Sequence, residues 1–372
     1  MSRKGKKRSQ RYTSSHCALC GAVRKDLILG LTGCGVCKPC LEAAKKLVPL
    51  DIPKKEEGSP RQAIKTPQEI LHELDQRIVG QEVAKAAISI AFWKQQLKAS
   101  GVASVPRSTL LLYGPTGCGK TAIAREAARI TGLPFIHFDA TSLSETGYRG
   151  RDADDMVKDL MIVAKGDVRA AYGVIFLDEL DKLTAQGGEQ RMAYARGTQH
   201  SLLRLIEGSE VRVGDKMIHT ENLLFIFGGA FNGIGPQAER KNPIGFGAQQ
   251  VEAVPHVIDT EDFVAYGMEP ELMGRVTQRV RLEALTREDL KRILLSTENS
   301  VFKQYQSFFH EQGIQLQLAP KRAEQIIDKA LACGTGARGL QTAVEDMVQP
   351  LLFRLAERRN KKDETWEIEG SA

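Results

Sequence analysis

The chain has 372 residues, 42% hydrophobic and 26% charged, so it is long enough for two or three folded domains and too apolar to be largely disordered. No apolar run approaches the ~20 residues that a membrane-spanning helix needs, and no secretory signal follows the charged N-terminus. We therefore expect a soluble protein of the cytoplasm.

The net charge of +6 is concentrated at the N-terminus. Residues 1–12 hold six basic side chains and no acidic one, whereas the rest of the chain carries 46 basic and 46 acidic residues. A basic segment on a neutral body is typical of a solvated, disordered arm. The alternative is a weak, salt-sensitive contact with nucleic acid or an acidic partner. The charge does not predict a DNA-binding domain.

Residues 13–48 are rich in cysteine, with the spacing C-x2-C-x16-C-x2-C that predicts a tetrahedral Zn²⁺ site. The four expected ligands are Cys17, Cys20, Cys37 and Cys40. Cys34 is an alternative ligand because it also forms a C-x2-C pair with Cys37, and His16 is expected to be a bystander. A unit this small buries little core, so we expect zinc to be structural and to supply its stability.

The rest of the chain divides by composition. Residues 49–65 mix proline, glycine and charged side chains, as a linker does. In residues 66–283 apolar strands alternate with amphipathic helices, which predicts an α/β domain with a mostly parallel sheet. Residues 284–372 are mainly helical, and Thr286 with Asp289 resembles a capping box at the start of a helix.

The strongest local pattern is the segment 114–121, Gly-Pro-Thr-Gly-Cys-Gly-Lys-Thr, a complete phosphate-binding loop. It follows the apolar run 110–113 and precedes a helical run, which is the strand–loop–helix context that the motif requires. The glycines let the backbone wrap phosphates, and the helix N-terminus offers free N–H groups to an anion. Lys120 would reach the β- and γ-phosphates of ATP, and Thr121 would hold Mg²⁺.

A second buried strand, residues 174–177, ends in Asp178 and Glu179. Its carboxyl end is expected beside the phosphate loop, where Asp178 would help to hold Mg²⁺ and Glu179 would polarise the attacking water. Together with the loop, this acidic pair predicts a nucleotide hydrolase rather than a nucleotide-binding protein alone.

Cys118 lies inside the phosphate loop, next to a helix N-terminus that favours the thiolate. We therefore expect alkylation of Cys118 to block nucleotide binding, and ATP to protect the thiol.

In this order the motifs resemble those of the AAA+ ATPases, and specifically the ClpX unfoldases, over nearly the whole chain after the basic arm. The matching segments are 17–40, 78–81, 114–121, 177–182, 205–208, 228–231, 271–275 and 336–340. The resemblance implies an N-terminal four-cysteine zinc domain, an AAA+ large domain with a parallel sheet, and a helical (α+β) small domain.

The resemblance also assigns roles to residues. Arg275 lies in a motif similar to the arginine finger, which acts on the ATP site of a neighbouring subunit, and Arg338 in one similar to the second sensor. Lys120, Asp178 and Glu179 complete the expected catalytic set. The residues expected to contact the nucleotide are Ile78, Val79, Gly114, Pro115, Thr116, Gly117, Cys118, Gly119, Lys120, Thr121, Ala122 and Arg338.

Two further segments resemble family loops. Tyr148 and Arg149 lie in a Gly-flanked segment similar to the pore loop that grips a translocating polypeptide. The family usually has Val at the position of Arg149, so a ring of six arginines would make the channel more basic. Ile244, Gly245 and Phe246 resemble the loop that docks on the peptidase ClpP.

Besides the basic arm and Arg149, the chain departs from the family at two places. Only residues 209–222 separate Gly208 from the strand near Leu223, without the Arg-Lys-His triplet that the family commonly carries, so its substrate-tag preferences do not transfer. The first-sensor residue is not assigned, although Asn232 is a candidate.

These patterns predict an ATP-dependent protein unfoldase that forms a ring hexamer and delivers substrates to a ClpP-type peptidase. The zinc domain would bind adaptors and substrates through dimerisation. The chain has no catalytic triad or metalloprotease motif, so it is not expected to cut peptides itself. The alternatives are a remodeller that works without a peptidase and, less favoured, a nucleic-acid motor. The related HslU unfoldases are disfavoured because they lack a zinc domain.

Overall fold

The computed structural model of the chain divides into two compact units, with the boundary between Gln62 and Ala63. The structure describes residues 16–23, 27–29, 35–47, 63–102, 104–143, 151–165, 171–184, 189–235, 258–298, 300–357 and 364–368. The basic arm, Cys34, Tyr148, Arg149 and the segment 244–246 lie outside these residues. The predicted domain boundaries stay predictions.

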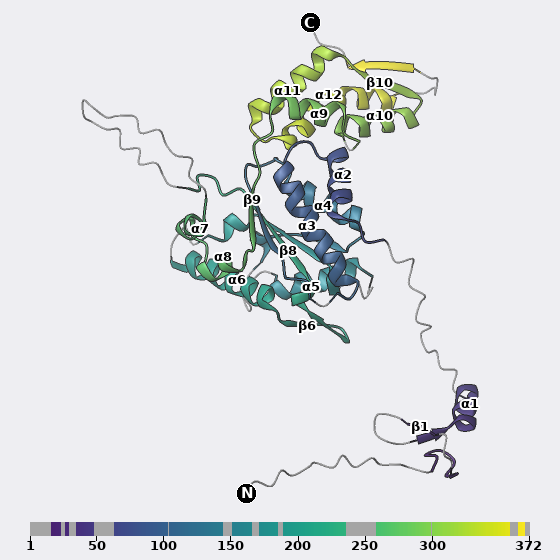
Figure 1. Ribbon diagram of the computed structural model, residues 1–372. Coiled ribbons are helices and arrows are strands. Elements are labelled where there is room, and N and C mark those ends of the chain that lie inside the picture. The colour runs from purple at the N-terminus through teal and green to yellow at the C-terminus, as the bar shows by residue number, and fades with distance from the viewer. Residues whose placement is uncertain are drawn as a thin grey trace, which may run out of the picture. The chain divides into compact units, whose positions relative to one another are not determined.

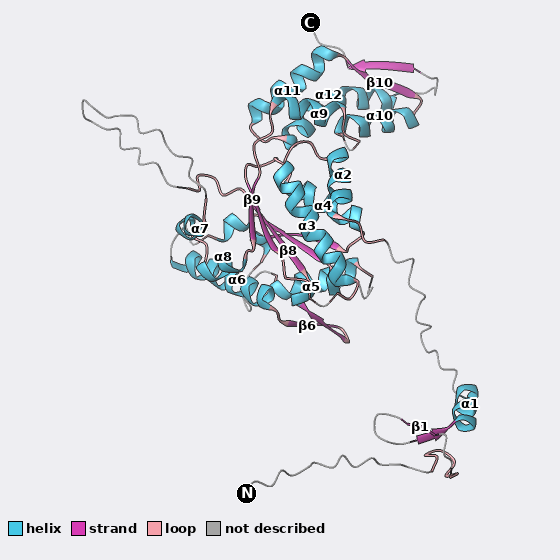
Figure 2. Ribbon diagram, in the orientation of Figure 1, coloured by secondary structure: helices cyan, strands magenta, loops and turns pink. Residues whose placement is uncertain are grey.

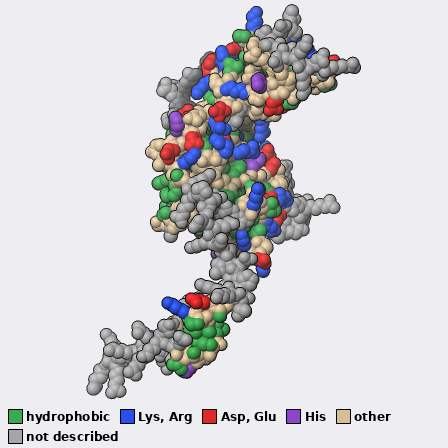
Figure 3. All heavy atoms as spheres, turned by 90° about the vertical axis from the view of Figure 1, so that its right-hand side faces the viewer, with side chains coloured by type: hydrophobic (Ala, Val, Ile, Leu, Met, Phe, Trp, Pro, Cys, Tyr) green, Lys and Arg blue, Asp and Glu red, His purple; other side chains and the backbone are tan. Residues whose placement is uncertain are grey.

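The first unit is small (Figure 1). Strand β1 (Leu27–Leu29) pairs antiparallel with β2 (Gly35–Cys37), and helix α1 (Lys38–Leu47) follows β2 directly. Hydrophobic side chains gather on the face of this unit that Figure 3 shows, and among its described side chains the large exposed hydrophobic ones are Leu19 and Val23.

The second unit is built around a five-stranded sheet with the order β4-β5-β8-β3-β9, in which all neighbouring strands are parallel. The strands are β3 (Thr109–Tyr113), β4 (Phe135–Asp139), β5 (Val174–Asp178), β8 (Leu224–Gly229) and β9 (Gln278–Arg281). Every residue of β3 and β8 is buried, because helices cover both faces of a parallel sheet. The predicted α/β architecture is confirmed.

Two groups of helices cover the sheet (Figure 2). Side chains of α2, α3 and α4 share one hydrophobic cluster with one face of the strands, and side chains of α5 to α8 share a second cluster with the other face. The helices are α2 (Pro67–Arg77), α3 (Glu82–Ala99), α4 (Lys120–Thr131), α5 (Ala153–Val163), α6 (Glu189–Glu207), α7 (Thr260–Tyr266) and α8 (Pro270–Arg275). Short 3₁₀ turns lie at Ala140–Ser142, Leu180–Leu183 and Thr220–Asn222.

A two-stranded hairpin connects α6 to β8. It lies at the position where the family that the sequence resembles commonly carries a longer loop. It consists of β6 (Glu210–Val213) and β7 (Lys216–His219), with Gly214 at a φ of 60° in the turn. Val211 and Ile218 are buried, so the hairpin packs on the domain.

The C-terminal part has its own hydrophobic core of helices and one strand pair. Its elements are α9 (Arg287–Leu295), α10 (Val301–Glu311), β10 (Ile314–Leu318), α11 (Pro320–Cys333), α12 (Ala337–Glu357) and β11 (Glu364–Ile368), with β10 parallel to β11. The predicted capping box is confirmed: the hydroxyl of Thr286 accepts from the N–H of Asp289, whose carboxylate accepts from the N–H of Thr286. Within the described ranges, none of the helices combines the length and the apolar character that a membrane span requires.

Candidate nucleotide site and metal centre

The phosphate-binding loop connects the end of β3 to the start of α4, as its sequence predicts. Gly114, Gly117 and Gly119 adopt φ values of 148°, 74° and 106°, which a residue with a Cβ rarely adopts. The Nζ of Lys120 is nearly buried and donates to the carbonyl oxygens of Gly114 at 2.7 Å and of Pro115 at 2.9 Å. The ammonium therefore lies inside the loop, where a phosphate would be cradled.

Asp178 at the end of β5 faces the first turn of α4. The hydroxyl of Thr121 donates to the Oδ2 of Asp178 at 2.8 Å. The backbone N–H of Glu179, the next residue, donates to the Oδ1 of Asp178 at 2.9 Å. Burial tends to raise the pKa of this carboxyl, but the neighbouring imidazole of His137, the hydrogen bonds from Thr121 and Glu179 and the charge of Lys120 outweigh burial and hold it at about 2. Asp178 therefore offers an ionised oxygen beside the hydroxyl of Thr121, and oxygen is the ligand type that Mg²⁺ prefers.

Glu179 follows Asp178 in a strained backbone conformation. Its φ is 58°, in the left-handed region, and its side chain is exposed. Strain of this kind costs about 1–3 kcal/mol and is often found at functional sites. Strand β5 ends at Asp178, so the exposed side chain of Glu179 follows the strand directly.

The segment 78–81, which includes the expected nucleotide contacts Ile78 and Val79, adjoins the phosphate loop through Gln81, which is not among the expected contacts. Ile78 and Val79 follow α2, and the Nε2 of Gln81 donates to the carbonyl oxygens of Cys118 at 3.3 Å and Glu283 at 2.8 Å. The N–H of Glu283 donates back to the Oε1 of Gln81 at 3.1 Å. Gln81 thus connects this segment, the phosphate loop and the chain that leads to α9.

The C-terminal domain also touches the phosphate loop. The N–H of Ala337 donates to the carbonyl oxygen of Gly117 at 3.0 Å. A Cβ on Gly117 would lie 1.9 Å from the carbonyl oxygen of Thr335, and one on Gly336 would lie 2.6 Å from the oxygen of Gly117. Arg338, in the first turn of α12, is exposed and only one residue away from these contacts.

The expectation of a reactive thiolate at Cys118 is wrong. The side chain is only 3% exposed, and its burial raises the pKa of the thiol despite the opposing charge of Lys120. The position at a helix N-terminus is correct. The sequence pattern did not reveal that the thiol belongs to the hydrophobic cluster that α2, α3 and α4 share with one face of the sheet.

The four predicted cysteines form a cluster in the first unit. The sulfur atoms of Cys17, Cys20, Cys37 and Cys40 all lie within 4.8 Å of one another. The backbone N–H of Cys37 donates to the Sγ of Cys17 at 3.3 Å and, with the N–H of Cys20, lowers the pKa of that thiol to about 6. Hydrogen bonds to Cys20 and Cys37 raise the pKa of Cys40 to about 12, because neighbouring sulfurs do not all ionise without a cation. A divalent ion that replaces these protons fits the cluster.

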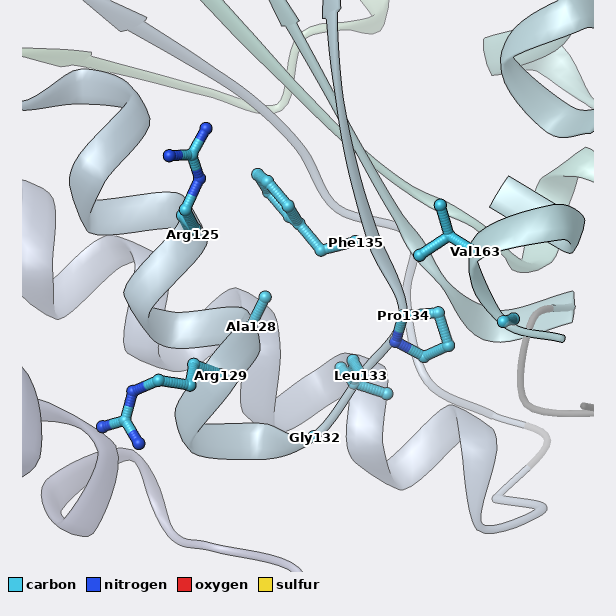
Figure 4. A pocket seen from close by; sticks show the side chains of 9 residues that line it. Arg125, Ala128, Arg129, Gly132, Leu133, Pro134, Phe135 and Val163 are labelled. Atoms are coloured by element: carbon cyan, nitrogen blue, oxygen red, sulfur yellow. The ribbon is translucent and has the colours of Figure 1, made fainter. Parts of the chain in front are cut away.

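A cavity of about 390 Å³ lies elsewhere, at the opposite end of α4 from the phosphate loop (Figure 4). Arg125 and Arg129 come from α4 and Phe135 from β4, and the guanidinium of Arg129 points away from Arg125 and Phe135. Arg129 is paired with Glu126. The cavity therefore does not belong to the nucleotide site.

Comparison with known proteins identifies the domains. Residues 105–279 match the family described as AAA domain (Cdc48 subfamily), and residues 285–368 match the C-terminal, D2-small domain of ClpB protein. Three curated proteins named ATP-dependent Clp protease ATP-binding subunit ClpX align along most of the chain. The protein of Azotobacter vinelandii is 33% identical over 91% of this chain and 86% of its own length. That of Treponema denticola is 35% identical (81% and 80%), and that of Bacteroides thetaiotaomicron is 33% identical (94% and 93%).

The chain belongs to the ClpX family. The resemblance to the ClpX-type AAA+ ATPases is thereby confirmed, and the enzyme is an ATPase rather than a peptidase. The donor sets of this ClpX-family chain fit the expected cofactors, which are ATP with Mg²⁺ at the phosphate loop and Zn²⁺ at the four thiols.

The structure does not bring Arg275 to the phosphate loop of its own chain. Arg275 ends α8, and its Nη2 lies 2.6 Å from the Oε1 of Glu207 at the end of α6. The guanidinium is 58% exposed, so it lies on the surface of this ClpX-family domain. Sequence reasoning missed a different residue, His137 in β4, whose Nε2 lies 3.6 Å from the Oδ2 of Asp178. Only the pairing of β4 with β5 reveals this proximity.

Proposed function

We propose that this chain is an ATP-dependent unfoldase and translocase that works as a ring hexamer and delivers unfolded substrates to a ClpP-type peptidase. The observation that carries the proposal is the convergence of the phosphate loop, the Asp178–Glu179 pair and residues 335–337 of the C-terminal domain in a member of the ClpX family. A site shared by two domains converts a change at the phosphates into a change of domain angle.

The hydrolytic roles follow from the side chains at the loop. Lys120 would bind the β- and γ-phosphates, while Thr121 and Asp178 would hold Mg²⁺, which neutralises charge on the phosphate oxygens. Glu179 would orient and polarise the attacking water, since phosphoryl transfer depends on positioning more than on covalent help. The low pKa of Asp178 supports its role as a ligand that stays ionised.

Movement would begin at the contacts of the phosphate loop. The loop meets the C-terminal domain at Ala337 and meets Glu283, in the connection to that domain, through Gln81. Arg338 would contact the phosphates of its own subunit, so that their loss releases the C-terminal domain. Arg275, exposed on the surface, would enter the ATP site of the neighbouring subunit and stabilise the charge of the transition state.

Substrate handling would use segments outside the described residues. Tyr148 and Arg149 would line the axial channel, and Ile244, Gly245 and Phe246 would anchor the ring to the peptidase. The exposed Leu19 and Val23 support a role of the zinc domain in binding adaptors and substrates through dimerisation. A cytoplasmic location stays a prediction, and so does the absence of a nucleic-acid partner.

The test is ATP-dependent proteolysis of a tagged fluorescent protein, with and without ClpP. We expect fluorescence to be lost only with ATP, and peptides to appear only when ClpP is present. Phe246→Ala should abolish peptide formation and retain ATP hydrolysis, whereas Lys120→Ala should lose both. Loss of fluorescence that is unchanged by ClpP, with no change in ATPase rate, would instead indicate a remodeller that works alone.

A further inference from the structure

His137 lies at the nucleotide site although no motif includes it. It occupies the third position of β4 and is paired in register with Phe176 of β5, two residues before Asp178. Side chains two residues apart on a strand share a face, so His137 and Asp178 lie on the same side of the sheet. The imidazole packs against the ring of Phe176, with 5.7 Å between the centroids, which limits its orientation.

Three elements each contribute a different type of ligand atom, and the three atoms lie around one carboxylate oxygen. The Oδ2 of Asp178 on β5 accepts from the hydroxyl of Thr121 on α4 at 2.8 Å and lies 3.6 Å from the Nε2 of His137 on β4. Neighbouring ligands of a six-coordinate ion lie about 3 Å apart, given metal–ligand distances of about 2.1 Å. The hydroxyl of Thr121 and the Nε2 of His137 thus both lie near the ligand–ligand distance from the same carboxylate oxygen, and the imidazole is only partly enclosed.

The ligand set distinguishes between metals. Mg²⁺ prefers oxygen ligands and keeps several of its waters, whereas imidazole nitrogen favours first-row transition ions. A site made of Thr121 and Asp178 alone offers only oxygen. Adding the Nε2 of His137 gives a mixed oxygen and nitrogen site, whose affinity for Mn²⁺ and still more for Co²⁺ increases relative to that for Mg²⁺.

We propose that His137 is a ligand of the nucleotide-bound metal ion and allows this ATPase to use a first-row divalent ion, such as Mn²⁺, in addition to Mg²⁺. The inference rests on the proposed roles of Thr121 and Asp178. It requires the lone pair of Nε2 to face the ion. A proton on Nε2 would instead make His137 a hydrogen-bond donor to Asp178, so the two roles exclude each other.

The direct test is pulsed electron paramagnetic resonance of Mn²⁺ bound to the full-length chain with a non-hydrolysable ATP analogue. The protein is labelled with ¹⁵N only in histidine, so that a nitrogen of adenine or of the backbone does not contribute. We expect a ¹⁵N coupling to Mn²⁺ in the wild type that is lost in His137→Phe, which keeps a ring against Phe176. His310→Gln, an exposed histidine of α10, is the matched control and should keep the coupling.

The metal preference gives a second readout. In competition titrations, His137→Phe should lower the affinity for Mn²⁺ about tenfold and that for Mg²⁺ less than about twofold. His137→Gln keeps a donor for Asp178 but no ring nitrogen, so it should behave like His137→Phe. Equal losses for both ions, or full rescue by His137→Gln, would show that His137 only positions Asp178 and would overturn the proposal.

Asp178→Asn separates this inference from the proposed function. If it abolishes Mn²⁺ binding while the wild type lacks a ¹⁵N coupling, the metal site is correct and the role of His137 is wrong. If Mn²⁺ binding is unchanged by Asp178→Asn, the assignment of the metal site itself fails, and the inference about His137 fails with it.

Discussion

The two metal-binding regions of this chain are assembled on very different length scales. All four thiols of the cysteine cluster come from Cys17 to Cys40, whereas the nucleotide site draws on segments between Ile78 and Arg338. In the described part of the first unit, the buried side chains of the core are those of Cys17 and Cys37. The nucleotide site instead stands on two large hydrophobic clusters, one on each face of the sheet.

This difference teaches where the stability of each site originates. A short cysteine-rich segment encloses its ligand locally, so metal binding supplies the folding free energy that a core supplies elsewhere. The nucleotide site is instead positioned by a fold with large hydrophobic clusters of its own, and its parts meet because the sheet and the C-terminal domain bring them together. Each region should therefore fail in its own way.

The largest effect is expected on removal of zinc from the first unit. Structural zinc is worth about 10–16 kcal/mol in small finger peptides, so Cys37→Ser should leave residues 13–48 unfolded. Limited proteolysis and zinc content of the full chain measure the loss, and the ATPase rate should stay within about twofold because the second unit keeps its own core. Cys333→Ser, an exposed cysteine of α11, is the matched control and should change neither.

A first unit that resists protease after zinc has been removed would contradict this account. It would mean that the short strands β1 and β2 and the helix α1 hold together through apolar contacts alone.

The next effect concerns Arg275, which tests whether the nucleotide site extends beyond one chain. Its ion pair with Glu207 is exposed, so Arg275→Ala should cost less than about 1 kcal/mol of folding stability. The ATPase rate should fall about 10³-fold or more, the effect of a trans arginine in GTPases. Thermal unfolding and steady-state hydrolysis measure the two quantities separately.

A mixing experiment shows in which chain Arg275 acts. Arg275→Ala and Glu179→Gln subunits should each be inactive alone. In a randomly mixed ring, about a quarter of the interfaces combine an intact Glu179 with an intact Arg275 from the neighbour. Recovered hydrolysis in the mixture supports action in trans, and its absence would place Arg275 in the site of its own chain or outside any site.

The same contrast explains what the sequence predicts. The phosphate loop, the zinc ligands and the Thr286 cap are local patterns, since the residues that make each one lie close together in the chain. His137 depends on the register of β4 against β5, which no local pattern reveals. The burial of Cys118 likewise depends on packing below the sheet, so the helix N-terminus alone gave the wrong expectation for its thiol.

The smallest of these effects, about 100-fold in ATP affinity, is expected for Gly117→Ala and tests the contact with the C-terminal domain most directly. The new methyl group would lie 1.9 Å from the carbonyl oxygen of Thr335, a backbone atom, so the phosphate loop and the segment around Thr335 must shift apart at a considerable cost. A displacement of about 1 Å at a reacting group costs a reaction about 10²-fold in rate, and we expect a loss of the same order in ATP affinity because the displaced loop no longer fits the phosphates. Fluorescence titration with an ATP analogue measures the affinity.

The matched control is Gly334→Ala, because Gly334 has a similar φ, 63° against 74°, but has no atom within 4 Å of the added carbon. Both substitutions place alanine in the left-handed region at a cost of about 1–2 kcal/mol, so both should lower the melting temperature by a similar amount. Only Gly117→Ala also separates the phosphate loop from Thr335. Equal losses of ATP affinity would attribute the effect to backbone strain and would leave the C-terminal domain without a part in the nucleotide site. A loss confined to Gly117→Ala would show that ATP binding depends on a contact between residues more than 200 positions apart in the chain. The cysteine cluster, by contrast, is formed entirely by residues 17–40.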